Sequence, residues 1–180
     1  FIFNCLNSIQ SFIMSHEREL AMEYLSKFAS LIRQNLNSSS YQFIPLDAEI
    51  KMLKNYLDLE RLRFNNKFEY NINLHENVDP IAVRIPPLLI QPYVENAVLH
   101  GMKQKEEGGK IDISLTIEND TLCIVIKDNG PGIDTSESKD KKSLGMSITQ
   151  RRIALMNKTS SDNYYINTIS SSKGTEIKIA

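Results

Sequence analysis

An apolar stretch of the chain, residues 85–101, carries polar side chains that could do chemistry at Asn96 and His100. Two prolines near its start and Gly101 at its end predict a helix, with proline in the first turn and glycine in a left-handed cap. Its apolar stripe at helical spacing consists of Leu88, Leu89, Tyr93, Ala97 and Val98. A side-chain amide on a helix that packs against a core is costly unless it has a partner. Asn96 is therefore either a ligand-binding residue or a structural cap of a neighbouring loop, and this stretch alone favours neither.

A second candidate stretch, residues 128–133 with the sequence Asp-Asn-Gly-Pro-Gly-Ile, follows the strand-like residues 121–127. A carboxylate at the end of a strand can accept a hydrogen bond from an exocyclic amine. The glycines let the backbone turn tightly and approach a ligand closely. An ordinary turn has the same composition, so the specific signal is the order of the motifs along the chain: the helix with Asn96, this stretch, Gly145, and then Gly174-Thr175.

Taken in order, these residues resemble the N, G1, G2 and final boxes of the GHKL ATPase fold, and more narrowly the catalytic domain of LytS/YesM-type sensor histidine kinases. The matching motifs are Glu95-Asn96-Ala97 with His100-Gly101, Asp128-Asn129-Gly130-Pro131-Gly132, Ser143-Leu144-Gly145-Met146 and Gly174-Thr175. Residues 1–9 are similar to the segment that directly follows the phosphoacceptor histidine in that family. The resemblance, which covers nearly the whole chain, implies a sensor histidine kinase of a two-component system.

The resemblance implies a site for ATP and Mg²⁺. Asp128 would accept a hydrogen bond from the adenine 6-amino group, and Gly130 and Gly132 would leave room for the ring. Asn96 would offer its side-chain oxygen to Mg²⁺, which prefers oxygen ligands, and is the expected catalytic residue. The other expected ATP-binding residues are His100, Ile133, Gly145, Met146 and Thr175.

Residues 134–145 would form a lid over the triphosphate, with the Gly145 amide facing anionic oxygens. His100 has an alternative explanation, since a histidine near a helix C-terminus also suits the helix dipole. Basic side chains near these motifs could neutralise phosphate or simply be solvated. They are Lys103, Lys105, Lys141, Lys142, Arg151 and Arg152.

The chain departs from the family pattern at three positions. Ser143 stands where glycine is common and Ile148 where asparagine is common. Pro92 stands where gyrase- and chaperone-type relatives carry the glutamate that activates water, so transfer to a side chain is favoured over ATP hydrolysis. The departures near the lid keep open an alternative function, a nucleotide-sensing interaction module without kinase activity.

The helical and strand-like patterns divide the chain in two, at residues 1–66 and 67–180. Residues 1 to about 37 keep one apolar phase, and 15–17 either kink or break the helix, which the sequence leaves open. A second helix follows from about 45 to 66. Together the helices predict a hairpin whose wide apolar faces pack either on the second half or in a dimeric bundle, and the resemblance favours the homodimer.

After residue 67 the pattern predicts an α/β sandwich. Strands are expected at about 67–74, 110–117, 121–127, 164–170 and 173–179, and a helix at 146–157 through Ile148, Ile153 and Leu155. The expected fold is therefore α+β: an N-terminal helical hairpin of the dimerisation type, followed by a two-layer GHKL/Bergerat α/β sandwich with a mixed sheet.

Composition adds limits on function and location. The 180 residues carry a formal net charge of −1, which does not suggest a nucleic-acid partner. Cys5 and Cys123 lie in predicted core segments, so reduced thiols are expected. No apolar run reaches the length of a membrane span. We expect the cytoplasmic domain of a bacterial membrane-anchored protein.

The resemblance also implies the phosphate acceptors. The family signature places the phosphoacceptor histidine immediately before Phe1, so we expect the chain as given to bind ATP without phosphorylating itself. The phosphate would pass from that histidine to an aspartate in the receiver domain of a response regulator. The spacing to His16 is about 24 Å along a helix, and His75 and His100 belong to the ATP-binding half, so none is the expected acceptor.

Overall fold

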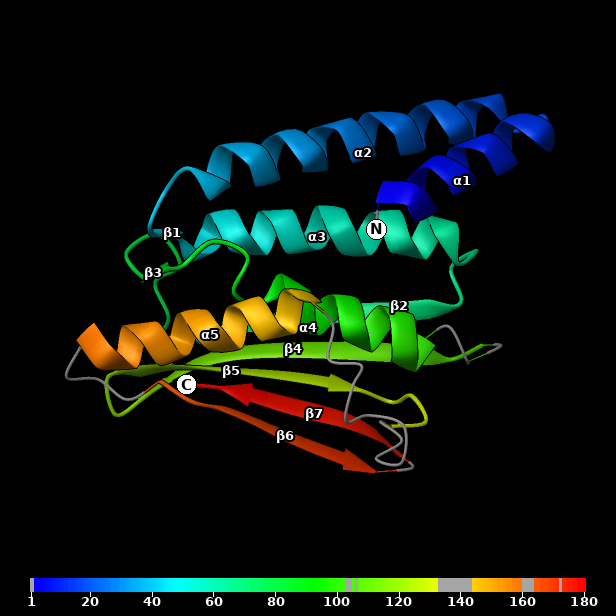
Figure 1. Cartoon of the computed structure of the whole chain (residues 1–180). Helices are drawn as coiled ribbons and strands as arrows, with labels where there is room; N and C mark the ends of the chain where they lie inside the picture. The colour runs from blue at the N-terminus through cyan, green and yellow to red at the C-terminus, as the bar shows by residue number, and fades with distance from the viewer. Residues whose placement is uncertain (1, 103–104, 106, 133–143, 160–163, 172) are drawn as a thin grey trace.

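A mixed sheet and the helices on one of its faces form the C-terminal half of the molecule (Figure 1). The computed structural model describes residues 2–102, 105, 107–132, 144–159, 164–171 and 173–180. In these residues the main sheet has five strands, β2 Phe68–Leu74, β4 Gly109–Glu118, β5 Thr121–Asp128, β6 Ile166–Ser171 and β7 Gly174–Ile179. Their order is β2-β4-β5-β7-β6, with β2 parallel to β4 and the other pairs antiparallel. This confirms the α+β class and the mixed sheet.

Alternation along the central strands explains why one face of the sheet is covered. Ile111, Ile113 and Leu115 of β4 are buried, and the residues between them are exposed or half-buried. The β4–β5 hairpin turns at Asn119 and Asp120, both with positive φ, as a tight hairpin turn requires. The hairpin predicted from the sequence is confirmed.

The helix expected at 85–101 begins later and ends differently. α4 spans Gln91–Asn96 and continues as a π-helical turn, η1, over Ala97–Met102. The residue before a proline avoids the helical region, so the two consecutive prolines keep residues 85 and 86 out of the helix. Leu88 then has a left-handed φ of 58°, and Pro92 takes the first helical turn instead. Gly101 lies inside η1 without a positive φ, so its prediction as a left-handed cap was wrong.

α5, Leu144–Thr159, covers the same face of the sheet as α4 (Figure 1). Its predicted stripe was partly wrong, because Ile148 and Leu155 are exposed and only Ile153 is buried. The buried face of α5 includes Met146, Thr149 and Ile153. These residues follow one another at spacings of three and four, which places them on one side of the helix.

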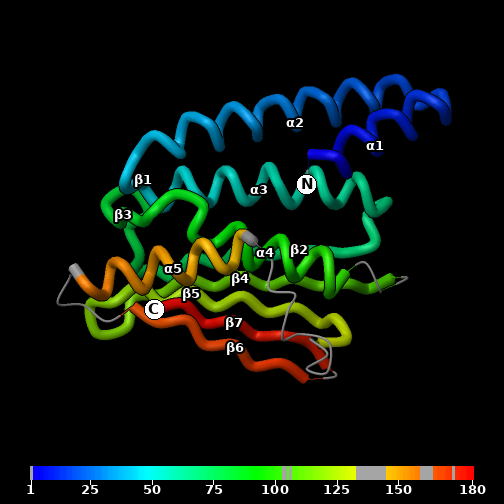
Figure 2. The backbone as a smooth tube through the Cα atoms, viewed as in Figure 1, coloured from blue at the N-terminus to red at the C-terminus, as the bar shows by residue number. Residues whose placement is uncertain are grey.

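The N-terminal helix is broken rather than kinked. α1 covers Ile2–Met14 and α2 Arg18–Ser39, and α1 folds back along α2 (Figure 2). The break is a Schellman motif: His16 has φ 61°, its N–H donates to the Ile13 carbonyl, and the Glu17 N–H donates to the Phe12 carbonyl. The predicted single apolar phase therefore splits, and Ile2, Leu6 and Ile13 are exposed while Cys5 and Phe12 are buried.

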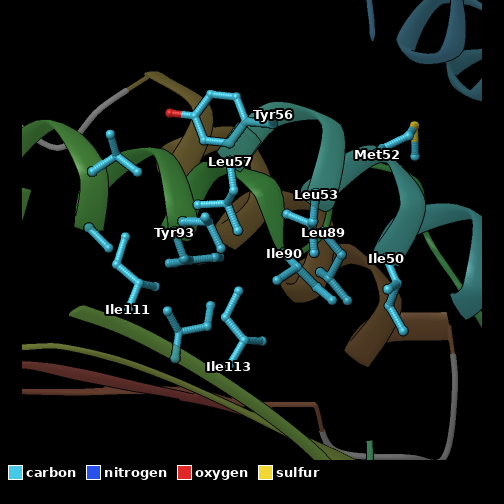
Figure 3. Close-up of a cluster of buried hydrophobic side chains, with 14 of the residues drawn as sticks. Ile50, Met52, Leu53, Tyr56, Leu57, Leu89, Ile90, Tyr93, Ile111 and Ile113 are labelled. Carbon is cyan, nitrogen blue, oxygen red and sulfur yellow. The ribbon is translucent and has the colours of Figure 1, made fainter. Parts of the chain in front are cut away.

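α3, Leu46–Arg63, lies between α2 and the layer of α4 and α5 (Figure 1). In Figure 3, Leu53 and Leu57 of α3 face Leu89 and Tyr93, which lie above the isoleucines of β4. The wide apolar face of α3 is therefore buried within this chain, the alternative that the family resemblance disfavoured. A two-stranded sheet, β1 Ile44–Pro45 with β3 Arg84–Ile85, also joins the helical half to the other half.

Both cysteines are free and buried, as expected. None of the helices in the described residues combines the length and the apolarity of a membrane span.

Candidate nucleotide site

Asp128 is the last residue of β5, the central strand of the sheet, and lies opposite Thr175 on β7. Its Oδ1 accepts a hydrogen bond from the Gly130 N–H at 2.9 Å. Desolvation by burial raises the pKa of Asp128, while hydrogen bonds from the Gly130 and Thr175 backbone and the charge of Lys105 oppose the shift. A half-buried carboxylate with acceptor capacity left over can take a hydrogen bond from an amine on a ligand.

Backbone, rather than side chains, surrounds this carboxylate. A Cβ on Gly101 would lie 2.9 Å from Asp128 Oδ1, and a Cβ on Gly130 would lie 2.4 Å from the Gly101 Cα. Gly174 has φ 133°, and its Cβ would lie 1.9 Å from the Asp128 carbonyl oxygen. The π-helical turn thus brings Gly101 against the turn after β5, and only residues without a side chain fit there. The surroundings of the Asp128 carboxylate are therefore formed largely by glycine backbone.

Asn129 ties this turn to the rest of the sheet. Its Oδ1 accepts from the Lys110 N–H at 2.8 Å, and its Nδ2 donates to the Gly108 carbonyl at 3.0 Å. No role for Asn129 was predicted from the sequence, although asparagine side chains commonly form hydrogen bonds with nearby backbone in turns. The residue holds the Asp128 turn against the start of β4.

Asn96 lies at the end of α4, where the start of α5 packs. Its amide NH₂ donates to the sulfur of Met146, and among the described residues no donor reaches its side-chain oxygen. Gly145 faces Pro92, with its hypothetical Cβ 3.2 Å from the Pro92 Cβ, and Thr149 donates to the Gly145 carbonyl. An amide oxygen without a donor is the kind of ligand that Mg²⁺ accepts, so the residue fits the metal.

The predicted site residues fall into two sets, and the residues within each set are in contact with one another. Asp128, Gly101, Gly130, Gly174 and Thr175 form one set, and Asn96, Met146 and Gly145 form the other. The continuous helical segment from Asn96 to Gly101 joins them.

The remaining predicted residues are placed less closely. His100 is exposed on η1. Gly132 lies beside the β6–β7 turn, where its Cβ would be 2.0 Å from the Ser171 carbonyl oxygen. Thr175 is buried, with its hydroxyl 3.2 Å from that of Ser170. Ile133 and the predicted lid up to Ser143 lie outside the described residues.

The basic residues predicted to neutralise phosphate differ in their positions and contacts. Lys103, Lys141 and Lys142 lie outside the described residues, and Arg151 is exposed. Lys105 is close enough to Asp128 for its positive charge to oppose the rise in the Asp128 pKa that burial causes. The guanidinium of Arg152 is already used for contacts within the chain, because it donates to the Pro87 carbonyl at 2.9 Å and to the Gln42 carbonyl at 3.4 Å. These contacts argue against a role in binding phosphate. No sequence signal pointed to them.

Comparison with known proteins places the chain among histidine kinases. Residues 86–180 match the model of the family "Histidine kinase-, DNA gyrase B-, and HSP90-like ATPase", and residues 1–68 match "Histidine kinase". The sensor histidine kinase/phosphatase LytS of Staphylococcus aureus is 37% identical over 80% of this chain. The chain spans 24% of the length of that relative.

Solved structures share the fold at low identity. The histidine kinase domain of the Erythrobacter litoralis EL346 blue-light activated kinase superposes with a TM-score of 0.58 at 16% identity, covering 93% of this chain and 81% of that one. Histidine kinase ThkA, solved in complex with the response regulator TrrA, has a TM-score of 0.50 at 17% identity, covering 99% of this chain and 57% of that one. These likenesses show the fold alone. The family match over residues 86–180 and the similarity in sequence to LytS show that the chain belongs to the histidine kinase-, DNA gyrase B- and HSP90-like ATPase family, and within it to the LytS-type histidine kinases.

Proposed function

We propose that this chain binds Mg-ATP and serves a sensor histidine kinase, which transfers the γ-phosphate to a histidine and then to a response-regulator aspartate. The observation that carries the proposal is Asp128, a half-buried carboxylate enclosed by the backbone of Gly101, Gly130 and Gly174. This arrangement suits a planar ring with an exocyclic amine, which is the adenine of ATP.

Each part of the site has a role in this proposal. Asp128 accepts from the adenine amine, and Thr175 beside it lines the ring. Asn96 holds Mg²⁺ through its side-chain oxygen, and the metal neutralises phosphate charge. The first turn of α5, with Gly145 and Met146, faces the phosphates, because backbone N–H groups at a helix start favour anions.

Pro92, which lies four residues before Asn96, supports phosphoryl transfer to a side chain rather than hydrolysis of ATP. Pro92 packs against Gly145 and offers no carboxylate to activate water. Phosphoryl transfer depends mainly on positioning and charge neutralisation, so a side-chain nucleophile would take the place of water.

The acceptors come from the family resemblance. His16 and His100 are exposed, and His75 is exposed and bonded to Asn77. We propose that the phosphoacceptor is the histidine that the family signature places before Phe1. ThkA, a relative in fold, was solved with a response regulator, and we propose a partner of the same kind here. By the same resemblance, the whole protein would be a homodimer anchored in a membrane, with this part in the cytoplasm.

Titration calorimetry with Mg-ATP tests the adenine anchor. Replacing Asp128 by Ala removes a charge-assisted hydrogen bond of about 1.5–3 kcal/mol, so ATP affinity should fall roughly 10- to 100-fold. Half-buried Asp112 on the neighbouring strand β4, which pairs with Lys110, provides the control, since Asp112→Ala should leave affinity unchanged. Unchanged affinity in Asp128→Ala would refute the anchor.

Labelling with γ-³²P-ATP separates kinase activity from nucleotide sensing. A chain extended to include the upstream histidine should acquire an acid-labile, base-stable phosphate, and its His→Ala variant should not. The 180-residue chain alone should bind ATP and stay unlabelled. Binding without labelling of the extended chain would favour the sensing module, and free phosphate in place of phosphoprotein would favour hydrolysis.

A further inference from the structure

A fully buried carboxylate of the helical half holds the start of the helix that carries Asn96. Glu49, in the first turn of α3, has 0% of its surface exposed. Its Oε2 accepts from the Leu88 N–H at 2.9 Å, and its Oε1 accepts from the Ile90 N–H at 3.1 Å. Both donors lie in the short turn that precedes α4, residues 86–90, which we call the α4 lead-in.

The cost of burying the Glu49 carboxylate is offset by hydrogen bonds from the α4 lead-in and from Gln91. Burying a carboxylate is costly unless hydrogen-bond donors compensate. Desolvation raises the pKa of Glu49, and the backbone N–H groups of Ile90, Leu88, Gln91 and Leu89 oppose that shift by favouring the charged form. Without the carboxylate, these buried N–H groups would lose their acceptor, which costs more than a bond that was never made.

The α4 lead-in also needs to be held. Leu88 adopts a left-handed φ of 58°, a conformation that is unfavourable for a residue with a side chain. On its other flank, Arg152 of α5 donates to the Pro87 carbonyl. The turn is thus held between α3 and α5, and Asn96 follows it within one short helix.

We propose that Glu49 is a positioning residue through which the helical half sets the place of Asn96. Because the single short helix α4, Gln91–Asn96, connects the α4 lead-in to Asn96, a displacement of α3 that separated Glu49 from the lead-in would release that helix. The helical half would thereby govern the phosphate end of the nucleotide site while leaving the Asp128 end, which lies on the sheet, in place. This consequence for Mg-ATP rests on the function proposed above, whereas the contact with the lead-in does not.

Hydrogen exchange of the ligand-free chain tests the positioning directly. Glu49→Gln keeps the shape of the side chain and replaces one of the two acceptor oxygens by a donor. Amides of residues 88–96 should exchange about tenfold faster, the equivalent of one hydrogen bond, while β4 and β5 are unchanged. The matched control is Asp47→Asn in the same turn of α3, since Asp47 is only half-buried and pairs with Lys51. It should change neither region.

Two outcomes would overturn the proposal. Unchanged exchange over residues 88–96 would show that Glu49 does not hold the lead-in, and equal acceleration in β4 and β5 would show that it contributes only to global stability. If Glu49→Gln does not fold, Glu49→Asp keeps the charge on a shorter side chain and is judged by the same comparison.

Calorimetry then connects the contact to the site. Glu49→Gln should weaken Mg-ATP binding about tenfold and leave adenosine affinity within about twofold, because adenosine needs only the Asp128 end. Equal losses for both ligands would contradict the proposed division of the site. If the unmodified chain fails to bind Mg-ATP, the proposed function falls, and the exchange measurement still decides the role of Glu49.

Discussion

At the scale of single residues, Asp128 combines a functional charge with a cost to stability. Because burial raises the pKa of Asp128, the folded chain holds this proton more tightly than the unfolded chain does. Its contribution to the free energy of unfolding is therefore highest below the pKa of an unfolded aspartate, and it declines as pH rises through the raised pKa.

Asp128→Asn should consequently separate stability from binding. The amide keeps an acceptor for the Gly130 N–H and carries no buried charge, so the free energy of unfolding at pH 7 should equal or exceed that of the unmodified chain. ATP affinity should fall about tenfold, because a charge-assisted hydrogen bond is roughly twice as strong as a neutral one. Urea titrations at pH 7 and at pH 4 measure the first effect, and the stability difference should shrink at the lower pH. Lower stability at pH 7 would show that the charge is net stabilising.

Asn96 makes the corresponding prediction for the metal. Asn96→Ala removes the proposed oxygen ligand, so Mg-ATP affinity should fall at least about tenfold while adenosine affinity changes less than about twofold. Titrations with and without Mg²⁺ distinguish the two explanations for this residue. Equal losses under both conditions would mean that Asn96 is a structural residue whose contact with Met146 holds α4 to α5.

At the scale of elements, α5 is fastened to both halves of the chain by one side chain. Arg152 reaches the carbonyls of Pro87, before α4, and Gln42, before β1. Arg152→Ala should lower the free energy of unfolding by about 1–3 kcal/mol, since the part-buried Pro87 carbonyl loses a charged donor. Arg151→Ala, on the exposed face of the same helix, should change it by less than about 0.5 kcal/mol. Equal denaturation midpoints for the two variants would contradict the role of this contact.

At the scale of the whole molecule, apolar surface is concentrated on the first two helices. Met22, Leu25 and Leu36 lie on one face of α2 with 73%, 50% and 66% of their surfaces exposed, and α1 adds Ile2, Phe3 and Leu6. Large contiguous apolar surface on a folded chain commonly marks an interface. This face, rather than that of α3, is where we propose the homodimer.

Charges on that face should prevent dimerisation. Sedimentation over a dilution series should show dimers for the unmodified chain and monomers for Met22→Glu combined with Leu25→Glu. Ile81→Glu is a control at a similarly exposed apolar residue outside the first three helices, and it should remain dimeric. An unmodified chain that stays monomeric at every concentration would refute the interface.

Local patterns in the sequence were enough for much of this structure. Alternating apolar residues predicted β2 and β4, and a run of β-branched and apolar residues predicted β5. Asn119-Asp120 predicted the hairpin between β4 and β5, because strand pattern and turn chemistry are properties of neighbouring residues. The order of the motifs around Asn96 and Asp128 predicted an adenine and phosphate site through the family resemblance, and that site stays a prediction.

Only the tertiary structure decided how those pieces are held. Whether residues 15–17 kink or break the helix depends on which residues find partners when α1 folds back, so periodicity could not settle it. Gly101 was expected as a cap, and it is instead a point of close approach to Asp128, a residue distant in the sequence. The contacts of Glu49 and Arg152 could not be predicted from the sequence, because their partners are backbone groups about 40 and 65 or more positions away, and backbone groups have no sequence signature. Motifs name the groups that can do chemistry, whereas long-range contacts between side chains and backbone set where those groups stand.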